Sequence, residues 1–261
     1  MAREGSEGRQ SEALSLPILQ AAIPDDQRRA AGRPLPGIQP CNGTDWLTID
    51  AAYVPQMAER ERLLSERPKD VLAVLPEAEK PARELLEQVL VLLAERRDFD
   101  VGRNTVARPD GHVVALDRSN PLATLGQLVT EDLCILQKSG AFHVLTGAVL
   151  CFPAGWTLTE KIGRPLTDIH DPVAEYDTSL ARRVQRLFDG VQVGRPIWRA
   201  NLLRYDDPAL FQPRKEGDPR HARDDDAPFE RSERQVIFRL PKSDAVIFTI
   251  HTSVARAANR P

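Results

Sequence analysis

A histidine on a stiff segment is the residue in this sequence best suited to chemistry. His170 lies in the stretch Gly163–Val173, with Pro165 before it and Pro172 after it. Pro172 restricts the backbone of Asp171, the residue directly after the histidine. A neutral imidazole held in this way suits the axial position of a haem iron. The same pattern also fits a histidine that caps a helix, so the residues alone leave both interpretations open.

Two acidic residues that follow His170 could assist such a site. Asp171 and Glu175 lie within the next five residues of the chain. A carboxylate there could orient the imidazole or accept a proton from a bound substrate. Acidic residues are also common in the first turn of a helix, where they interact favourably with the helix dipole. Either residue is therefore a candidate for such a role, with a helix-terminal charge as the alternative.

Arginines form the second group of candidates, because a cation on a partly buried sheet face needs an anionic partner. Arg199 shares one face of a predicted strand, residues 197–205, with Asn201. Its partner could be a cofactor propionate, a substrate carboxylate or an internal glutamate. Arg231 and Arg234 could likewise bind carboxylates through bidentate hydrogen bonds. Ordinary surface ion pairs are the alternative for these arginines.

Flat apolar side chains stand where a predicted strand leaves the sheet. Phe152 and Trp156 flank a proline and a glycine that force the chain out of the sheet. They form either a corner of the core or a surface that packs against a flat cofactor. Cys151 could ligate iron as a thiolate, although cysteine is more often a small buried hydrophobic residue. His143 and His251, on predicted strands, are expected either to be hydrogen-bonded sheet histidines or to face a cofactor.

The elements that must position these residues are mainly strands. Residues 128–138 and 141–152 predict a β-hairpin, and a second hairpin joins residues 234–240 to 245–252. The residues between the hairpins, 153–196, favour helices. This order predicts an α+β fold with an antiparallel sheet of about five strands and helices on one face. The charged residues 206–232 predict a solvated loop.

Composition divides the chain into three predicted parts. Residues 1–15 are small and polar, as in disordered tails. Residues 16–104 predict an extended arm and a helical section that packs on the core, which spans residues 105–261. The strongest helix begins near Pro76 or Pro81, where apolar residues recur at helical spacing: Leu85, Leu86, Val89, Leu90 and Leu93.

Composition also excludes several classes of function. The 261 residues carry 35 basic and 38 acidic side chains and a net charge of -3, so we expect no nucleic-acid partner. No apolar run reaches the length of a membrane span, and the N-terminus is polar, so we expect no membrane contact. Three cysteines without a CxxC pair favour a reducing, cytoplasmic compartment.

Motifs for flavin, nicotinamide and iron–sulfur cofactors are missing from the sequence. It contains no GxGxxG, Walker, GxSxG or HExxH pattern. Three scattered cysteines cannot supply the four thiolates of an iron–sulfur cluster. Electrons for any redox reaction must therefore come from another chain or domain.

Five short motifs in one order carry a resemblance to a known family. They are Glu131–Cys134, Cys151–Trp156, Lys161–Gly163, Ile169–Val173 and Arg231–Gln235. Together they resemble the haem-dependent oxidative N-demethylase family over about residues 35–255. The resemblance implies a PAS-like haem-binding core. It also implies removal of a methyl group from a small secondary or tertiary amine such as dimethylamine, with O2 consumed and formaldehyde released.

The resemblance also implies roles for individual residues. Haem b would be held by His170, which thereby becomes the iron ligand. Electrons would come from a separate flavin or iron–sulfur reductase. The remaining roles fall on residues near the haem: distal-pocket catalysis on Arg199 and Glu175, and either propionate contact or structural pairing on Arg231 and Arg234.

The sequence departs from the family pattern at two places. Ala174 stands where a second proline is expected, and residues 215–226 look like an insertion. Both departures affect the rim of the pocket and the choice of substrate more than the fold. A non-catalytic PAS-like sensor or interaction module that binds haem or another ligand is the main alternative, and a cofactor-free relative is a third. A sensor is usually joined to an output domain, for which 261 residues leave little room, and this favours the enzyme.

Overall fold

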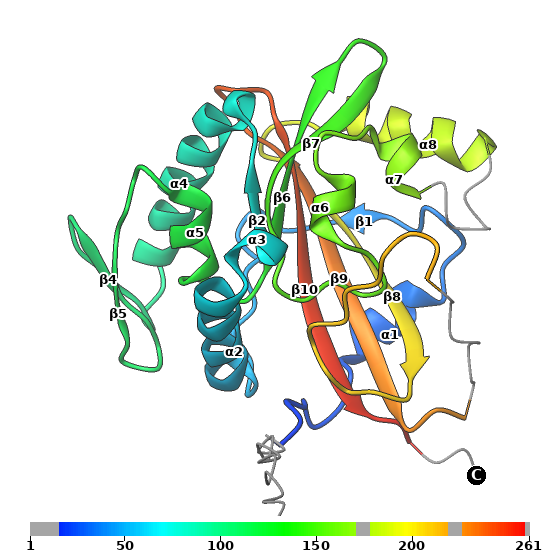
Figure 1. Cartoon of the computed structure of the whole chain (residues 1–261), viewed down its shortest axis with the longest axis horizontal. Coiled ribbons are helices and arrows are strands. Elements are labelled where there is room, and N and C mark those ends of the chain that lie inside the picture. Colours follow the sequence, from blue (N-terminus) through cyan, green and yellow to red (C-terminus); the bar gives the residue numbers. More distant parts are fainter. Residues whose placement is uncertain (1–15, 171–177, 219–225, 259–261) are drawn as a thin grey trace, which may run out of the picture.

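The computed structural model describes residues 16–170, 178–218 and 226–258 (Figure 1). Among these residues the main element is a seven-stranded antiparallel sheet. Its strands, in spatial order, are β1 (Gln39–Pro40), β8 (Ile197–Tyr205), β9 (Phe229–Arg239), β10 (Val246–Arg256), β6 (Asp132–Ser139), β7 (Phe142–Val149) and β2 (Leu72–Val74). A separate three-stranded sheet contains β3 (Asp100–Val101), β4 (Thr105–Ala107) and β5 (Val113–Ala115).

The α+β class predicted from the sequence is confirmed, but the sheet is larger than the predicted five strands. The five central strands all come from residues 132–256 and include both predicted hairpins. The two additional strands, β1 and β2, come from the N-terminal part of the chain and pair with the outer edges of β8 and β7. Strands of two and three residues are too short to produce a visible alternation in the sequence.

Helices cover both faces of the sheet, so the prediction of helices on one face was wrong. Helices α2, α4 and α5 lie on one side in Figure 1, and α6, α7 and α8 lie on the other. The strands allow this because both of their faces are apolar: Val236 and Phe238 of β9 enter one hydrophobic cluster, and Ile237 enters the other. The eight α-helices are α1 (Asp25–Ala31), α2 (Tyr53–Glu66), α3 (Pro68–Val71), α4 (Glu79–Ala94), α5 (Pro121–Gly126), α6 (Leu158–Lys161), α7 (Leu166–His170) and α8 (Thr178–Gly190), as far as the chain is described.

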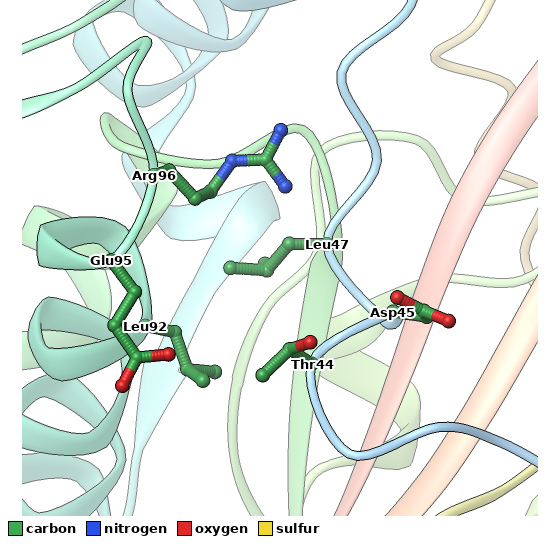
Figure 2. Close-up of a pocket in the computed structure, with 6 residues that line it drawn as sticks. All are labelled: Thr44, Asp45, Leu47, Leu92, Glu95 and Arg96. Atoms are coloured by element: carbon green, nitrogen blue, oxygen red, sulfur yellow. The ribbon is translucent and has the colours of Figure 1, made fainter.

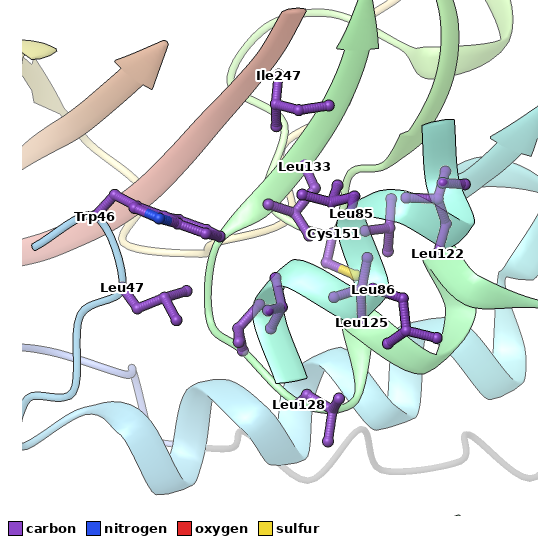
Figure 3. Packing of buried hydrophobic residues seen from close by; sticks show 14 of the residues in the cluster. Trp46, Leu47, Leu85, Leu86, Leu122, Leu125, Leu128, Leu133, Cys151 and Ile247 are labelled. Carbon is purple, nitrogen blue, oxygen red and sulfur yellow. The ribbon is translucent and has the colours of Figure 1, made fainter. Parts of the chain in front are cut away.

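The larger hydrophobic cluster lies between the sheet and helices α2, α4 and α5 (Figure 3). Helix α4 buries the apolar stripe that the sequence predicted, with Leu85 and Leu86 fully enclosed. Trp46 and Leu47, which precede α2, close one end of the cluster. No helix in the described ranges is both long enough and apolar enough to cross a membrane.

A fully buried ion pair joins α2 to the sheet. Arg60 Nη1 lies 2.6 Å from Asp132 Oδ1, and neither side chain is exposed to solvent. Asp132 also accepts hydrogen bonds from the backbone N–H groups of Cys151 and Phe152, at 2.7 and 2.9 Å. Arg60 Nε donates to the Gly126 carbonyl oxygen at 3.1 Å. The pair therefore fixes α2, the end of α5, the start of β6 and the exit from β7 at one point.

Substitution of Arg60 tests the importance of this pair. We expect Arg60→Ala to lower the free energy of unfolding by about 3–5 kcal/mol, because it leaves the Asp132 carboxylate buried without its counter-charge. Arg62→Ala is the matched control on the same helix, since Arg62 pairs with Glu59 and Glu66 at the surface. That change should cost at most about 1 kcal/mol. Urea denaturation of both variants measures the difference, and equal losses would contradict the assigned role.

Candidate functional site

A row of polar side chains crosses the half-buried face of β8 and β9. The strand register places Arg199 opposite Gln235 and Asn201 opposite Glu233. Arg199 Nη1 donates to Gln235 Oε1 at 2.8 Å, and Asn201 Nδ2 donates to Glu233 Oε2 at 2.9 Å. Gln235 Nε2 in turn donates to Glu233 Oε2 at 3.3 Å. We call these four residues the polar row.

Arg199 is the incompletely satisfied member of the polar row. Its Nε atom is buried and has no hydrogen-bond partner among the described residues. Burial lowers the pKa of Arg199, and the charge of Glu233 opposes this effect. A guanidinium group that is largely removed from water is costly unless an anionic group completes its hydrogen bonds. The Nε–H group of Arg199 can therefore donate a hydrogen bond to an acceptor that the described residues do not supply.

Arg231 differs from Arg199 because the fold supplies acceptors for both of its Nη atoms, although its Nε atom also has no hydrogen-bond partner among the described residues. Its side chain is 2% exposed, with Nη2 donating to the Phe152 carbonyl at 2.7 Å and Nη1 to the Leu210 carbonyl at 3.0 Å. Glu233 Oε1 lies 3.6 Å from its Nε. These bonds tie β9 to two loops, which indicates a structural role for Arg231.

Arg234 lies on the other face of the sheet from Arg199. It alternates with Glu233 and Gln235 along β9 and shares the face of Val236. Its guanidinium lies 5.0 Å above the centre of the Trp198 ring, and Nη2 lies 3.6 Å from Cys41 Sγ. The structure therefore does not bring Arg231, Arg234 and Arg199 together around one group.

The two predicted aromatic residues also separate. Phe152 is buried in the larger cluster, where the Arg60 guanidinium lies 5.4 Å from its ring centre. Trp156 is half-buried and packs against the smaller cluster, which contains Ile237 and is partly lined by Ile197. Trp156 is thus on the same side of the sheet as the polar row, and Phe152 forms the corner of the core.

His170 ends helix α7, which is attached to the sheet on the side of the polar row. The Leu145 N–H donates to the Arg164 carbonyl at 3.1 Å, and the Gly163 N–H donates to the Leu145 carbonyl at 2.8 Å. Leu166, in the first turn of α7, is buried in the smaller cluster. The backbone before His170 is therefore anchored. The His170 side chain, Asp171 and Glu175 lie outside the residues whose side chains are described.

His143 is a hydrogen-bonded sheet histidine. Its backbone N–H donates to Gln185 Oε1 at 3.3 Å, and Gln185 Nε2 lies 2.8 Å from His143 Nδ1. Because Oε1 already accepts from the backbone, the Gln185 amide nitrogen donates to Nδ1 and leaves the proton on Nε2. Burial lowers the pKa of His143, which keeps the ring neutral. This arrangement ties α8 to β7.

The loop after β8 is anchored to the fold where it is described, and most of its described residues are exposed, as predicted for a solvated loop over residues 206–232. Gln212 N–H donates to the Pro153 carbonyl at 3.0 Å, and Gly155 N–H donates to the Gln212 carbonyl at 2.9 Å. The nearly fully buried Lys161 forms an ion pair with Glu216. The ammonium group needs this counter-charge to be buried, and it fixes the loop against α6. The loop also ends early, because β9 begins at Phe229.

A shallow pocket of about 210 Å³ lies elsewhere, between the residues before α2 and the end of α4 (Figure 2). Asp45, Glu95 and Arg96 supply its charged groups, and Arg96 is already paired with Asp98 at 3.1 Å. The pocket is smaller than the roughly 300–1,000 Å³ typical of ligand sites. No cluster of three or more metal-ligating side chains occurs within the described ranges.

The sequence indicates Arg199 as a candidate, but it does not show that Gln235 and Glu233 are its neighbours. The motif Arg231–Gln235 contains both residues, and strand alternation places them on one face. The missing information was the register between β8 and β9, which decides that Gln235 lies opposite Arg199.

The contrast between Arg199 and Arg231 can be tested by stability alone. We expect Arg231→Met to lower the free energy of unfolding by about 2–5 kcal/mol, because two buried carbonyl oxygens lose their donors. Arg199→Met should change it by less than about 1 kcal/mol or increase it, since a poorly satisfied buried cation is removed. Urea denaturation without added ligand distinguishes the two, and a large loss in Arg199→Met would contradict a functional role for its charge.

A comparison with known protein families agrees with the motifs in the sequence. The model of the family described as haem-dependent oxidative N-demethylase, alpha subunit-like, matches residues 37–259. The matched region includes the polar row, α7 and all of the predicted site residues. The resemblance noted in the sequence is thus confirmed, and the chain belongs to the haem-dependent oxidative N-demethylase alpha-subunit-like family.

Proposed function

We propose that the chain binds haem b and catalyses oxidative N-demethylation of a small secondary or tertiary amine, with a PAS-like core as the haem-binding domain. Family membership supports the dependence on haem. The observation that supports a haem site at this place in the chain is the buried Nε atom of Arg199 on the polar row, which has no hydrogen-bond partner among the described residues. The haem would lie on that side of the sheet, the side to which α7 is attached.

The residues of this face fit a haem group. Haem b carries two propionates, and a half-buried guanidinium with a free N–H is a suitable donor for an anionic oxygen. Trp156 offers flat apolar surface on the same side of the sheet. His170 would hold the iron, because it ends a helix whose start is bonded to β7. Iron held in this way would supply the activation of O2 and the oxidation of the N-methyl group, while the protein supplies binding and polarity.

The polar row would fix the position of the Arg199 charge. Gln235 accepts from one arm of the guanidinium and also donates to Glu233, and Asn201 holds Glu233 from the neighbouring strand. This chain of bonds leaves the Nε edge of Arg199 free to donate to the propionate or to a negatively charged group formed during the reaction.

Glu175 is our candidate for the residue that binds the substrate. A carboxylate there would attract the ammonium form of the amine and accept its proton, so that the neutral amine could react. Glu175 follows His170 by five residues, so both would approach the haem from the same segment. The product would be formaldehyde and the amine without its methyl group. Electrons would come from a separate flavin or iron–sulfur reductase.

Haem binding is the first test of this function. We expect the purified chain, supplied with haem, to develop a Soret absorption band, and His170→Ala to lose or shift that band. His112→Ala is the matched control, since His112 is an exposed histidine on a turn. Failure of the wild-type chain to bind haem would overturn the proposed function, and an unchanged spectrum in His170→Ala would overturn the ligand assignment.

Turnover is tested with the haem-loaded chain, dimethylamine, O2 and a low-potential electron donor, with formaldehyde as the readout. We expect Arg199→Met to reduce the rate about 100-fold, the usual cost of removing one positioned donor from a reacting centre. Haem binding without formaldehyde release from any small amine would favour the alternative of a non-catalytic, PAS-like ligand sensor.

A further inference from the structure

A second row of ionisable side chains crosses the opposite face of the sheet. Arg234 of β9 is the register partner of His251 of β10. Ile250 is paired with Asp132 of β6, which places Glu131 beside His251 on its other side. His251 and Glu131 are each only 1% exposed. This row has no part in the proposed reaction.

The row contains an unusual concentration of unsatisfied polar atoms. Both ring nitrogens of His251, Oε2 of Glu131 and Nη1 of Arg234 are buried and have no hydrogen-bond partner within the described residues. Thr249 Oγ1, two residues before His251 on the same face, is also unpartnered. Buried polar groups are nearly always hydrogen-bonded, so a full charge on either His251 or Glu131 would be poorly supported here.

One segment of the chain covers both His251 and Glu131. We call residues 44–52 the docking segment. The Thr48 N–H donates to Glu131 Oε1 at 2.7 Å, and Asp50 Oδ2 lies 4.0 Å from His251 Nε2. Trp46, near the start of the segment, packs against Phe238 with 4.9 Å between ring centres and a 37° tilt between the rings, and Figure 3 shows it lying over the sheet.

Charged groups from β9, α2 and the docking segment surround His251 and Glu131. Arg234 of β9 and Arg60 of α2 face both His251 and Glu131, and Asp50 of the docking segment faces His251. Burial nevertheless dominates at both groups. It raises the pKa of Glu131 to about 7 and lowers the pKa of His251 to about 4. Between these values the docked pair holds one proton, and that proton is on Glu131.

When His251 and Glu131 are exposed to water, the proton that they share lies on the other residue. The ordinary pKa values are 4.5 for glutamate and 6.5 for histidine. An exposed pair therefore also holds one proton between those values, but on the histidine. The two states contain the same number of protons and differ in which residue carries the proton.

We propose that docking of residues 44–52 transfers a proton from His251 to Glu131, so that the segment closes over two neutral groups without taking up or releasing a proton. The carboxylate becomes a carboxylic acid as the imidazolium becomes a neutral imidazole, so charge and atoms balance. Burial also raises the pKa of Asp132, the next residue, but Arg60 and the backbone N–H groups of Cys151 and Phe152 oppose this effect. Glu131 has the Thr48 N–H, its own backbone N–H and Coulombic attraction to Arg60 and Arg234, and these do not offset its burial.

Proton linkage gives this proposal a distinctive signature. The raised pKa of Glu131 contributes stability that is complete below 4.5 and is lost as pH rises through about 7. The lowered pKa of His251 contributes stability that is complete above 6.5 and is lost as pH falls through about 4. In the wild type the two effects cancel, so the docking equilibrium should change by only about threefold between pH 4 and 8.

Each single substitution should therefore create a pH dependence that the wild type lacks. In Glu131→Gln only the histidine titrates, and docking should weaken by about 100-fold as pH falls from 8 to 4. In His251→Gln only the glutamate titrates, and docking should weaken by about 200-fold as pH rises from 4 to 8. Glu230→Gln and His112→Gln are the controls. Glu230 is a buried carboxylate paired with Arg28, and His112 is exposed and lies 3.8 Å from Glu61, so both have partners outside the docking segment.

The measurement is hydrogen–deuterium exchange of peptides that span residues 44–52 in the full chain, corrected for the intrinsic pH dependence of amide exchange. Opposite slopes in the two variants and a nearly flat wild type support the proposal. Slopes that match the controls, or a wild type with the steep slope of either variant, overturn it.

A second measurement needs no substitution. In carbon-13 NMR of the wild type, we expect one glutamate carboxyl to titrate near pH 7, as the raised pKa of Glu131 requires. If all glutamate carboxyl groups titrate below pH 5, the docked Glu131 is ionised and the proposal fails, whether or not the variants fold. Neither measurement involves haem, so the outcome is independent of the proposed function.

Discussion

The buried contact between Arg60 and Asp132 is the constraint on which most of the structure depends. It joins a helix from the N-terminal part of the chain to the first central strand of the sheet. The same carboxylate holds the backbone where β7 ends, at Cys151 and Phe152. The chain then continues from that point to α6 and α7, so the position of His170 depends on a contact made on the other side of the sheet. A charge pair in this environment is favourable only because its hydrogen bonds are nearly complete.

Two buried arginines of this protein, Arg199 and Arg231, differ in how many hydrogen-bond acceptors surround them. Arg231 and Arg199 are both buried cations of the β8–β9 region, and the Nε atom of each has no hydrogen-bond partner among the described residues. The fold nevertheless supplies Arg231 with backbone acceptors for both of its Nη atoms and places Glu233 3.6 Å from its Nε, whereas Arg199 donates to Gln235 through one Nη atom. A charge that the fold holds with several acceptors has a structural role, whereas a charge with few acceptors is available to a ligand. This criterion separates the two arginines without reference to the reaction.

The sequence predicted those features that repeat over many residues and missed those that depend on pairing. The two hairpins and the apolar stripe of α4 were predicted because alternation and helical spacing extend over eight or more residues. The helices on both faces of the sheet were not predicted. The central strands are apolar on both sides, and this pattern does not show how many faces of the sheet are covered by helices. Arg199 could be identified from its type and strand position. Its partner Gln235, and the separation of Arg231 from Arg234 onto different faces, required the register and contacts of β9.

The two short strands from the N-terminal part of the chain have a consequence for solubility. Strands β1 and β2 occupy the two edges of the main sheet, and β1 ends in Pro40, which has no N–H to offer to a further strand. An open sheet edge is a template for pairing with another chain, and short or proline-containing edge strands block such pairing. Without its first 75 residues, the chain would leave Ile197 and Trp198 of β8 and residues 147–149 of β7 without their strand partners at the same time. The N-terminal part therefore protects the sheet from self-association, in addition to covering its core.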